Sequence, residues 1–215
     1  MQGQKGSPKS NIAMIVCVNE GERELVIKRS RFIAISRHIE ARDDVNAMID
    51  ALKSEHVGAR HICYGYIADE KGDDFGYDDN GEPTGTAGKP IYSAIAAADA
   101  RKTCIAVVRY FGGIKLGAGG LTRAYRESAA ELIAEVGVSK AEKYAVVEMC
   151  CGNEAYKRAN AVLRGLNCTI LQIRYESNVT CTVLVMASKL SELTKTLDFL
   201  KAEYAVVGER YVAVE

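Results

Sequence analysis

The second half of this chain alternates between two apolar periods, and this alternation restricts the folds open to it. Runs of period two, typical of strands, are interrupted twice by runs in which apolar residues recur every three to four positions, as in helices. The runs predict strand 142–151, helix 153–165, strand 168–175, strand 178–186, helix 189–202 and strand 206–214. This β-α-β-β-α-β order is the split β-α-β pattern. We therefore expect residues 141–215 to form a ferredoxin-like domain.

The first half has a different order of elements. Its patterns predict strands near residues 12–18, 22–28, 31–37, 61–68 and 104–110, and helices at 41–56, 90–100 and 121–136. A long loop at 69–89 and a glycine-rich turn at 111–120 interrupt this series. We expect residues 11–137 to form an N-terminal domain, residues 137–140 to act as a linker, and the class to be α+β. The polar residues 1–10 are predicted to be a disordered tail rather than a signal peptide.

Charge and cysteine content favour a soluble cytoplasmic protein. Lys and Arg together number 28, and so do Asp and Glu, so no overall charge attracts the chain to nucleic acid or membrane. The seven cysteines form no C-x-x-C motif, and most lie in apolar runs, as free thiols do in a reducing compartment. No early apolar run is long enough to cross a bilayer, so no membrane association is expected.

A basic glycine-rich segment at residues 109–126 is the strongest candidate for a binding site. It contains Arg109, Lys115, Arg123 and Arg126 and no acidic residue. Its glycines lie between a predicted strand and a predicted helix, and they are Gly112, Gly113, Gly117, Gly119 and Gly120. Glycines allow close approach of a ligand, and the helix start offers free N–H groups. We expect an anion cradle here; the alternative is a tight turn whose glycines serve packing alone.

Known nucleotide signatures do not fit this segment. Ala118 and Gly119 stand where a Walker A loop needs Lys followed by Ser or Thr. Thr122 stands where the dinucleotide motif needs its last glycine. The segment is therefore predicted to bind an anion without a recognised nucleotide motif.

The loop at 69–89 is rich in acidic residues. An EF-hand alignment would put Gly76 and Ala87 where carboxylates are required, so that calcium site is excluded. A solvated loop is favoured over a magnesium site. Closer to the predicted helix, Thr84 and Thr86 lie among turn residues; Thr86 is expected to cap a turn, and Glu82 to pair with the basic segment.

Few features of the sequence suggest an enzyme. His61 and Cys63 lie two apart on a predicted strand and so face one side, an arrangement open to nucleophilic catalysis but more typical of core packing. His38 and His56 show no metal-ligand spacing. We predict no catalytic residue, metal or cofactor.

Two long motifs carry a resemblance to a known family. Residues 79–90 read DNGEPTGTAGKP and residues 109–125 read RYFGGIKLGAGGLTRAY, with SRFI at 30–33 and ARHICY at 59–64 in support. Over roughly residues 20–135 the chain resembles the IMPACT family, in its bacterial YigZ-type branch. Asn80 departs from the Asp more usual in that family, which weakens the case for a metal there.

The resemblance implies a fold and a cellular context. It implies a ribosomal protein S5 domain 2-like N-terminal domain followed by a ferredoxin-like domain, a pair similar to the last two domains of elongation factor G. Eukaryotic members of the family regulate translation by competing with an amino-acid-starvation kinase for its ribosome-bound activator. The resemblance implies no catalytic residues for the bacterial branch.

The leading hypothesis is a non-enzymatic protein of translation that binds RNA or the ribosome. Its phosphate contacts are expected from the basic segment, with Tyr110 and Tyr125 as stacking faces, His61 in support and Phe111 packed in the core. Two alternatives stay open. One is an enzyme that binds a small phosphate compound or nucleotide at the same loop, with Glu82 or Asp79 holding Mg²⁺. The other is a regulator whose acidic loop at 69–82 meets a basic, translation-associated protein.

Overall fold

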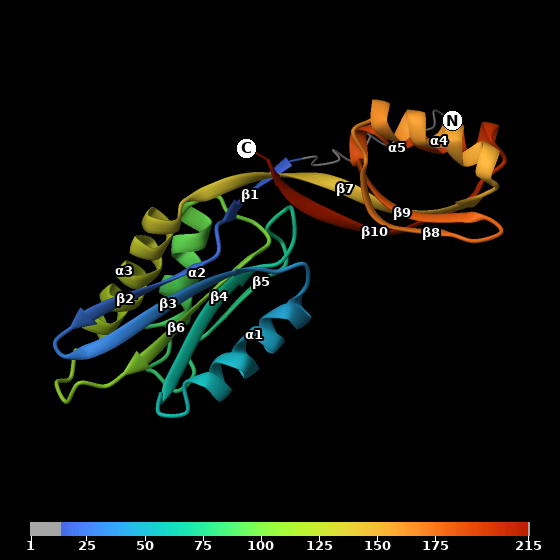
Figure 1. Cartoon of the computed structure of the whole chain (residues 1–215). Coiled ribbons are helices and arrows are strands. Elements are labelled where there is room, and N and C mark those ends of the chain that lie inside the picture. The colour runs from blue at the N-terminus through green and yellow to red at the C-terminus, as the bar shows by residue number, and fades with distance from the viewer. Residues whose placement is uncertain (1–13, 215) are drawn as a thin grey trace, which may run out of the picture. The chain divides into compact units, whose positions relative to one another are not determined.

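The computed structural model describes residues 14–214, which divide into two compact units, residues 15–140 and residues 141–214 (Figure 1). The predicted tail at 1–10 lies outside the described residues. Both units combine helices with a β-sheet, so the chain has a mixed α/β architecture that is compatible with an α+β fold of two domains.

The first unit is built on a five-stranded sheet of order β2-β3-β6-β4-β5 in which all neighbours are antiparallel. Its strands are β2 (Gly21–Ile27), β3 (Ser30–His38), β4 (His61–Ile67), β5 (Phe75–Asp78) and β6 (Thr103–Tyr110). Its helices are α1 (Arg42–Glu55), α2 (Gly88–Ala97) and α3 (Ala118–Val136).

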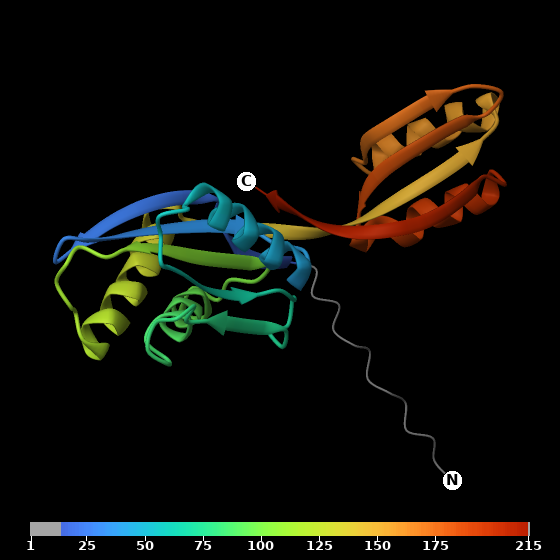
Figure 2. The ribbon, with the colours of Figure 1, turned by 90° about the horizontal axis from the view of Figure 1, so that it is seen from below.

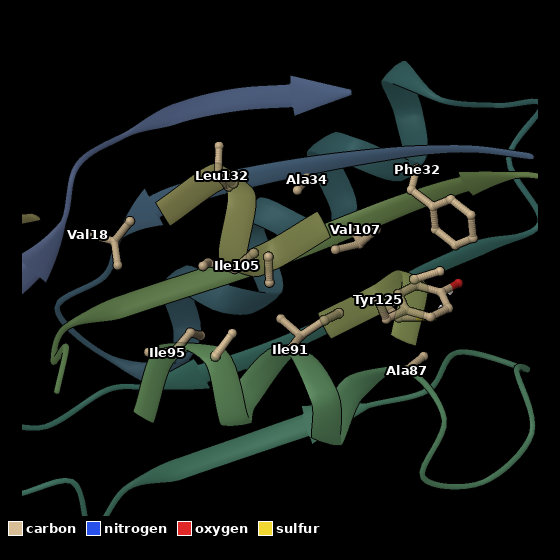
Figure 3. Packing of buried hydrophobic residues seen from close by; sticks show 14 of the residues in the cluster. Val18, Phe32, Ala34, Ala87, Ile91, Ile95, Ile105, Val107, Tyr125 and Leu132 are labelled. Atoms are coloured by element: carbon tan, nitrogen blue, oxygen red, sulfur yellow. Dashed lines mark hydrogen bonds between the residues drawn. The ribbon is translucent and has the colours of Figure 1, made fainter. Parts of the chain in front are cut away.

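Alternate residues of the central strand β6 serve two separate cores. Cys104, Ala106 and Val108 pack with α1 on one face of the sheet. Ile105 and Val107 pack with α2 and α3 on the other face, where their side chains meet the helices (Figure 3). Since side chains alternate along a strand, a strand that is apolar throughout is required between two helical layers. The unit is therefore a three-layer structure with the sheet in the middle.

The second unit contains β7 (Val138–Cys151), α4 (Asn153–Gly165), β8 (Thr169–Tyr175), β9 (Val179–Met186), α5 (Leu190–Phe199) and β10 (Glu203–Val214). Within this unit the strands pair in the order β7-β9-β8, with β10 also paired to β7. Strand β1 (Met14–Val18) lies almost entirely in the first unit. Helices α4 and α5 cover one face of this sheet (Figure 2). The element order is the β-α-β-β-α-β order expected from the sequence.

Three boundaries differ from the sequence prediction. Strand β5 lies inside the predicted loop at 69–89, where it pairs with β4 from Ile67↔Phe75 to Tyr64↔Asp78. Helix α3 begins at Ala118 rather than near residue 121. The prediction started it too late because Gly119 and Gly120, in its first turn, are poor helix formers. The expected linker at 137–140 belongs largely to strand β7.

All seven cysteines are free thiols, and five of them are buried. This agrees with their predicted role as small apolar residues of the core. Within residues 14–214, the structure contains no helix that is both long enough and apolar enough to cross a bilayer.

Helix α2 lies so close to β4 that residue 65 must be glycine. A Cβ on Gly65 would lie 2.5 Å from the backbone nitrogen of Tyr92 and 2.7 Å from its Cα. Because backbone atoms cannot yield as a flexible side chain does, Gly65→Ala is expected to lower the free energy of unfolding in urea by about 1–3 kcal/mol. Gly165→Ala, at the end of α4 with no atom near its Cβ, is the matched control and should leave stability equal or slightly higher. Equal effects of the two substitutions would contradict the packing described here.

Candidate functional site

Strand pairing places Phe32, His61 and Arg109 side by side at one end of the first sheet. Arg109, near the end of β6, lies directly opposite Phe32 of β3 on one side and His61 of β4 on the other. Because Arg109 is two positions after Val107, its side chain points to the face covered by α2 and α3. At this end of the face, the two glycine-rich stretches of the sequence, residues 79–90 and 109–125, meet.

A buried ion pair joins the two stretches. Glu82 Oε1 accepts a hydrogen bond from the Arg109 guanidinium at 2.5 Å and another from the Tyr125 hydroxyl at 2.8 Å. The side chains of Arg109 and Glu82 are only 7% and 4% exposed. The guanidinium also lies 5.4 Å from the centre of the Phe32 ring and 5.7 Å from that of Phe111. Arg109 is thus neutralised within the protein and is not free to contact a phosphate, contrary to the expectation from sequence.

Tyr125 and Cys63 are part of the same buried group. Tyr125 is fully buried with its ring edge-on to Phe32 at 5.3 Å (Figure 3), so it offers no stacking face to a base. Burial raises the pKa of its hydroxyl far above the usual range. Cys63 Sγ lies 3.0 Å from the carbonyl oxygen of Asp79 and 3.4 Å from the Tyr125 hydroxyl, and burial raises the pKa of the thiol to about 12. Cys63 is therefore a protonated core thiol.

His61 does not activate that thiol. Its Nδ1 lies 2.9 Å from the carbonyl oxygen of Asn80, and the neighbouring Ile62 N–H donates to the Asn80 side-chain oxygen at 3.0 Å. Both contacts fix the start of the 79–88 loop against β4. The arrangement supports the interpretation of His61 and Cys63 as structural residues.

The loop at 79–88 is organised around the carboxylate of Asp79. Its oxygens accept hydrogen bonds from the N–H groups of Gly85 at 2.6 Å, Ala87 at 2.9 Å and Gly88 at 2.9 Å. Desolvation by itself would raise the pKa of Asp79, but these three hydrogen bonds together lower it below the usual value. Asp79 thus holds the loop in place, and it accepts hydrogen bonds from the N–H groups of Ala87 and Gly88, where helix α2 begins.

The two threonines of this loop behave differently. The Thr86 hydroxyl donates to the carbonyl oxygen of Pro83 at 2.6 Å and closes a turn in which Thr86 is buried. Thr84 is exposed. Thr86 therefore has the turn-capping position expected from the sequence.

Three glycines of the basic segment have structural reasons to be glycine. A Cβ on Gly112 would lie 2.0 Å from the backbone carbon of Arg29, and the Gly112 N–H donates to the Ser30 hydroxyl at 3.1 Å. Gly113 and Gly117 have φ angles of +86° and +72°, which other residues rarely adopt. At these three positions the packing interpretation explains the glycine.

Gly119 has no such reason. It lies in the first turn of α3 with a negative φ, and a Cβ there would meet no atom within 4 Å. The nearby Gly120 would meet the Leu116 side chain at 3.0 Å, so its small size is explained in part by packing. A glycine in a helix costs about 1 kcal/mol relative to alanine. The open space above Gly119 is therefore an unexplained feature of the helix start.

Three exposed cations of the segment lie near Gly119 in the sequence. Lys115, Arg123 and Arg126 are exposed, and none of them has an ion pair with a residue in 14–214. Gly119, Arg123 and Arg126 are spaced by four and three residues and so share one face of α3. Long side chains on a helix lean toward its N-terminus, which carries Arg123 toward the first turn.

The structure adds residues that the sequence did not suggest. The exposed Lys28 and Arg29, with φ angles of +46° and +65°, form the turn between β2 and β3, and Arg29 touches Gly112. Their proximity follows from the pairing of Arg31 with Tyr110, which no local pattern indicates. Phe111, expected in the core, is instead 51% exposed.

Tyr110 is partly buried beside the segment. Its hydroxyl lies 2.9 Å from His56 Nδ1, and the Arg31 guanidinium lies 5.3 Å from its ring centre. Arg31 is itself paired with Glu24 at 2.8 Å. One face of Tyr110 is thus engaged within the protein.

Among residues 14–214, no three side chains of His, Cys, Asp or Glu converge on a point that could hold a metal ion.

The site lies within a region shared with known proteins. The family model of the Impact N-terminal domain matches residues 28–133, which include both glycine-rich stretches. The chain is 35% identical to IMPACT family member YvyE of Bacillus subtilis (strain 168), with 74% of this chain and 73% of the relative covered. It is 31% identical to IMPACT family member YigZ of Escherichia coli (strain K12), with 85% and 91% covered. The chain belongs to the IMPACT family.

Membership of the IMPACT family confirms the resemblance stated from the two motifs, including its YigZ-type branch. A solved structure described as an hypothetical protein is also similar to this IMPACT family member. It has a TM-score of 0.66 and 26% identity, with 95% of this chain and 98% of that chain covered.

The buried ion pair makes a stability prediction. Glu82→Gln leaves the Arg109 charge buried without its counter-charge, so it is expected to lower the free energy of unfolding in urea by about 3–5 kcal/mol. Glu154→Gln, which breaks the exposed Lys157–Glu154 pair at 2.6 Å, is the control and should change stability by less than about 1 kcal/mol. The double variant Glu82→Gln/Arg109→Met should be more stable than Glu82→Gln alone. A decrease no larger than that of the control would show that the pair is not a structural element.

The hydrogen bonds to Asp79 predict a pH dependence. A carboxyl whose pKa is lowered on folding contributes stability above its unfolded pKa, near 4, and loses it as pH falls through the lower folded pKa. Asp79→Asn should therefore destabilise the protein most at pH 6–7, with the difference from the wild type shrinking below about pH 4. Unfolding in urea at several pH values measures this. Asp73→Asn, in the exposed part of the loop, should show no such pH-dependent difference; a constant deficit for Asp79→Asn would argue against a role of the charge.

Proposed function

We propose that this IMPACT family protein binds RNA phosphates of the translation machinery at the start of α3. The first N–H groups of a helix lack intrahelical partners and carry the positive end of the helix dipole. In this protein they lie beside a glycine with open space above it and beside exposed arginines on the same face. A phosphate placed there receives backbone hydrogen bonds and charge-assisted ones together.

The observation that carries the proposal is the set of unpaired cations around Gly119. Lys115, Arg123 and Arg126 are exposed in a chain whose total charge is balanced. Arg29 and Lys28 extend this surface beyond the helix start. Arg109 has a supporting role, since it fixes the loop at 79–88 and the ring of Phe111 rather than reaching the ligand.

The exposed Phe111 favours single-stranded or looped RNA. Its ring is half exposed beside the cations, with the Arg109 guanidinium near it. Base stacking on an aromatic ring next to a cationic groove is typical of proteins that bind unpaired nucleotides. In this proposal Phe111 takes the stacking role that the sequence analysis gave to Tyr110 and Tyr125.

The fold supports a translation context by analogy. The antiparallel sheet and helix order of residues 15–140 are those we expect of a ribosomal protein S5 domain 2-like domain, and the β-α-β-β-α-β order of residues 141–214 is that of a ferredoxin-like domain. A pair of this kind resembles the last two domains of elongation factor G. Fold analogy carries less weight than the site itself.

The contacts of the acids disfavour the alternative of a magnesium-dependent nucleotide enzyme. One oxygen of Glu82 is already bonded to Arg109 and Tyr125, and both oxygens of Asp79 accept backbone N–H groups. A Mg²⁺ ion would therefore compete with these hydrogen bonds at Asp79, and at Glu82 it would have to bind beside the Arg109 cation. A small phosphate compound would still fit the same cations, so ATP binding measured by calorimetry distinguishes it from RNA.

Removal of the free cations tests the proposal. The variant Lys115→Ala/Arg123→Ala/Arg126→Ala is expected to bind single-stranded RNA and ribosomes more weakly. The slope of log K against log salt should fall by about 2, or roughly 0.7 for each phosphate that is no longer neutralised. The control Arg158→Ala/Arg164→Ala/Lys195→Ala removes the same charge from exposed positions of α4 and α5. Filter binding at several salt concentrations measures both variants.

The two variants give distinct outcomes. An effect confined to the first supports the site at α3. Equal decreases in both indicate attraction by charge in general, and unchanged binding in the first variant rejects the assignment. Binding partners that survive RNase treatment and do not respond to the triple substitution would instead favour a protein partner for the acidic loop at 69–82.

A further inference from the structure

Strand β5 forms an open edge of the first sheet. It is the last strand in the order β2-β3-β6-β4-β5 and pairs with β4 alone. The basic turn of Lys28 and Arg29 joins β2 to β3 and so lies toward the other edge of the sheet. An edge strand presents backbone N–H and C=O groups that can pair with a further strand. The edge at β5 contains none of the residues proposed to bind RNA.

The register of β5 shows which backbone groups are open. The Ala68 N–H donates to the carbonyl oxygen of Asp74 at 2.7 Å, so these two residues form a hydrogen-bonded pair of the ladder. Such pairs alternate with pairs that are not hydrogen-bonded. Gly76 is therefore bonded to β4, whereas Phe75 and Tyr77 direct their N–H and C=O groups away from it. No residue within 14–214 forms a hydrogen bond with these outward groups.

Aromatic rings accompany the open backbone. Phe75 and Tyr77 lie on the face covered by α2, where their ring centres are 4.9 Å and 5.9 Å from that of the partly buried Tyr92. Both are nearly half exposed, at 47% and 45%. The three rings therefore form an aromatic row along the edge, next to unpaired backbone groups. Exposed aromatic surface of this kind is typical of an interaction site.

Unpaired acids flank the aromatic row on both sides. Asp73 and Asp74 precede Phe75, and Asp78 follows Tyr77; all three acids are exposed and form no ion pair with a residue in 14–214. Residues 69–82 contain seven acids and one lysine in a chain of balanced charge. The edge is therefore a region of negative potential.

The charges select among possible occupants of the edge. A nucleic acid is repelled by the acids. A second copy of this chain is disfavoured, because antiparallel pairing of two β5 strands about Gly76 puts Asp74 of each copy opposite Asp78 of the other, and like charges opposite each other destabilise a sheet. A lysine or arginine side chain is attracted by the acids and also by the faces of the aromatic rings.

We propose that β5 accepts an extended, lysine- or arginine-bearing segment of a partner protein as an added strand. The backbone of the segment exchanges hydrogen bonds with Phe75 and Tyr77, and its basic side chains lie over the aromatic row and near the flanking acids. The open edge is short, since a Cβ on Gly88 at the start of α2 would lie 2.6 Å from the backbone nitrogen of Asp78. Charge and aromatic contacts therefore supply much of the affinity.

Nuclear magnetic resonance of the whole chain, labelled with ¹⁵N, tests the location of the added strand. The probe is a synthetic eight-residue peptide of alternating lysine and threonine. We expect it to shift the amide signals of Phe75 and Tyr77 and to slow the exchange of these two N–H groups with solvent. The Gly76 N–H, which is already bonded to β4, is the internal reference and should change little. Absence of any change at β5 with millimolar peptide overturns the proposal.

Two control peptides separate strand addition from attraction by charge. One has glutamate in place of lysine, and the other keeps every lysine but is methylated on each backbone nitrogen. Both should bind about tenfold or more weakly than the probe, because the first is repelled by the acids and the second has no N–H donors. Binding of the glutamate peptide as tight as that of the probe contradicts the predicted basic partner. Equal binding of the methylated peptide contradicts strand addition.

Substitution of the flanking acids tests the charge of the edge. Asp73→Asn/Asp74→Asn should weaken binding of the lysine peptide by about threefold to tenfold at low salt. Glu176→Gln/Glu203→Gln removes the same charge from exposed positions of the second unit and should leave the affinity unchanged. Circular dichroism verifies that both variants fold. An unchanged affinity in the first variant, or an equal decrease in both, overturns the assignment to β5.

Two further measurements separate this proposal from others. Slow exchange of the Phe75 and Tyr77 amides in concentrated protein without peptide would identify a second copy as the occupant and overturn the proposal. The variant Lys115→Ala/Arg123→Ala/Arg126→Ala should bind the lysine peptide no more weakly than the wild type does, since it retains the whole of β5. Because that variant is the one expected to lose RNA binding, failure at one site is distinguishable from failure at the other.

Discussion

Burial of the Arg109 guanidinium is the constraint on which the candidate site depends. A buried cation is tolerated only with a counter-charge and hydrogen bonds, and Glu82 supplies the counter-charge here. The three participants come from different elements: Arg109 from the sheet, Glu82 from the loop at 79–88, and Tyr125 from α3. The ion pair therefore fixes the loop and the helix against the same end of the sheet. The position of the α3 start, with its free N–H groups, follows from this attachment.

Much of the fold could be predicted from the sequence because its elements are periodic. Strand β6 is apolar from Cys104 to Val108, as suits a strand between two helical layers, and α4 and α5 show clear helical faces. Strand β5 escaped prediction because its four residues are too few to establish a period, and pairing with β4 creates it. The start of α3 escaped prediction because glycines have low helix propensity, which tertiary contacts override in this protein.

The candidate site was predictable in its composition but not in its contacts. The sequence shows that Lys115, Arg123 and Arg126 lie in a segment without acids, and the structure leaves these three exposed. It does not show that Arg109 is neutralised by an acid 27 residues earlier, since loop closure alone brings the two together. Likewise, Arg29 reaches Gly112 through the register of β3 with β6. Long-range pairing of this kind leaves no local signal.

The two ends of helix α3 show why the unpaired cations are informative. In its C-terminal half, Glu131 and Glu135 are both paired with Arg23 of β2, so each of these two charges has a partner within the protein. In its N-terminal half, Arg123 and Arg126 form no ion pair with an acidic residue among residues 14–214, although the chain as a whole contains equal numbers of acids and bases. Repulsion between these cations and the helix dipole makes their position unfavourable in isolation. An anion bound at the helix start would reverse the sign of both interactions, which is the physical reason to place the ligand there.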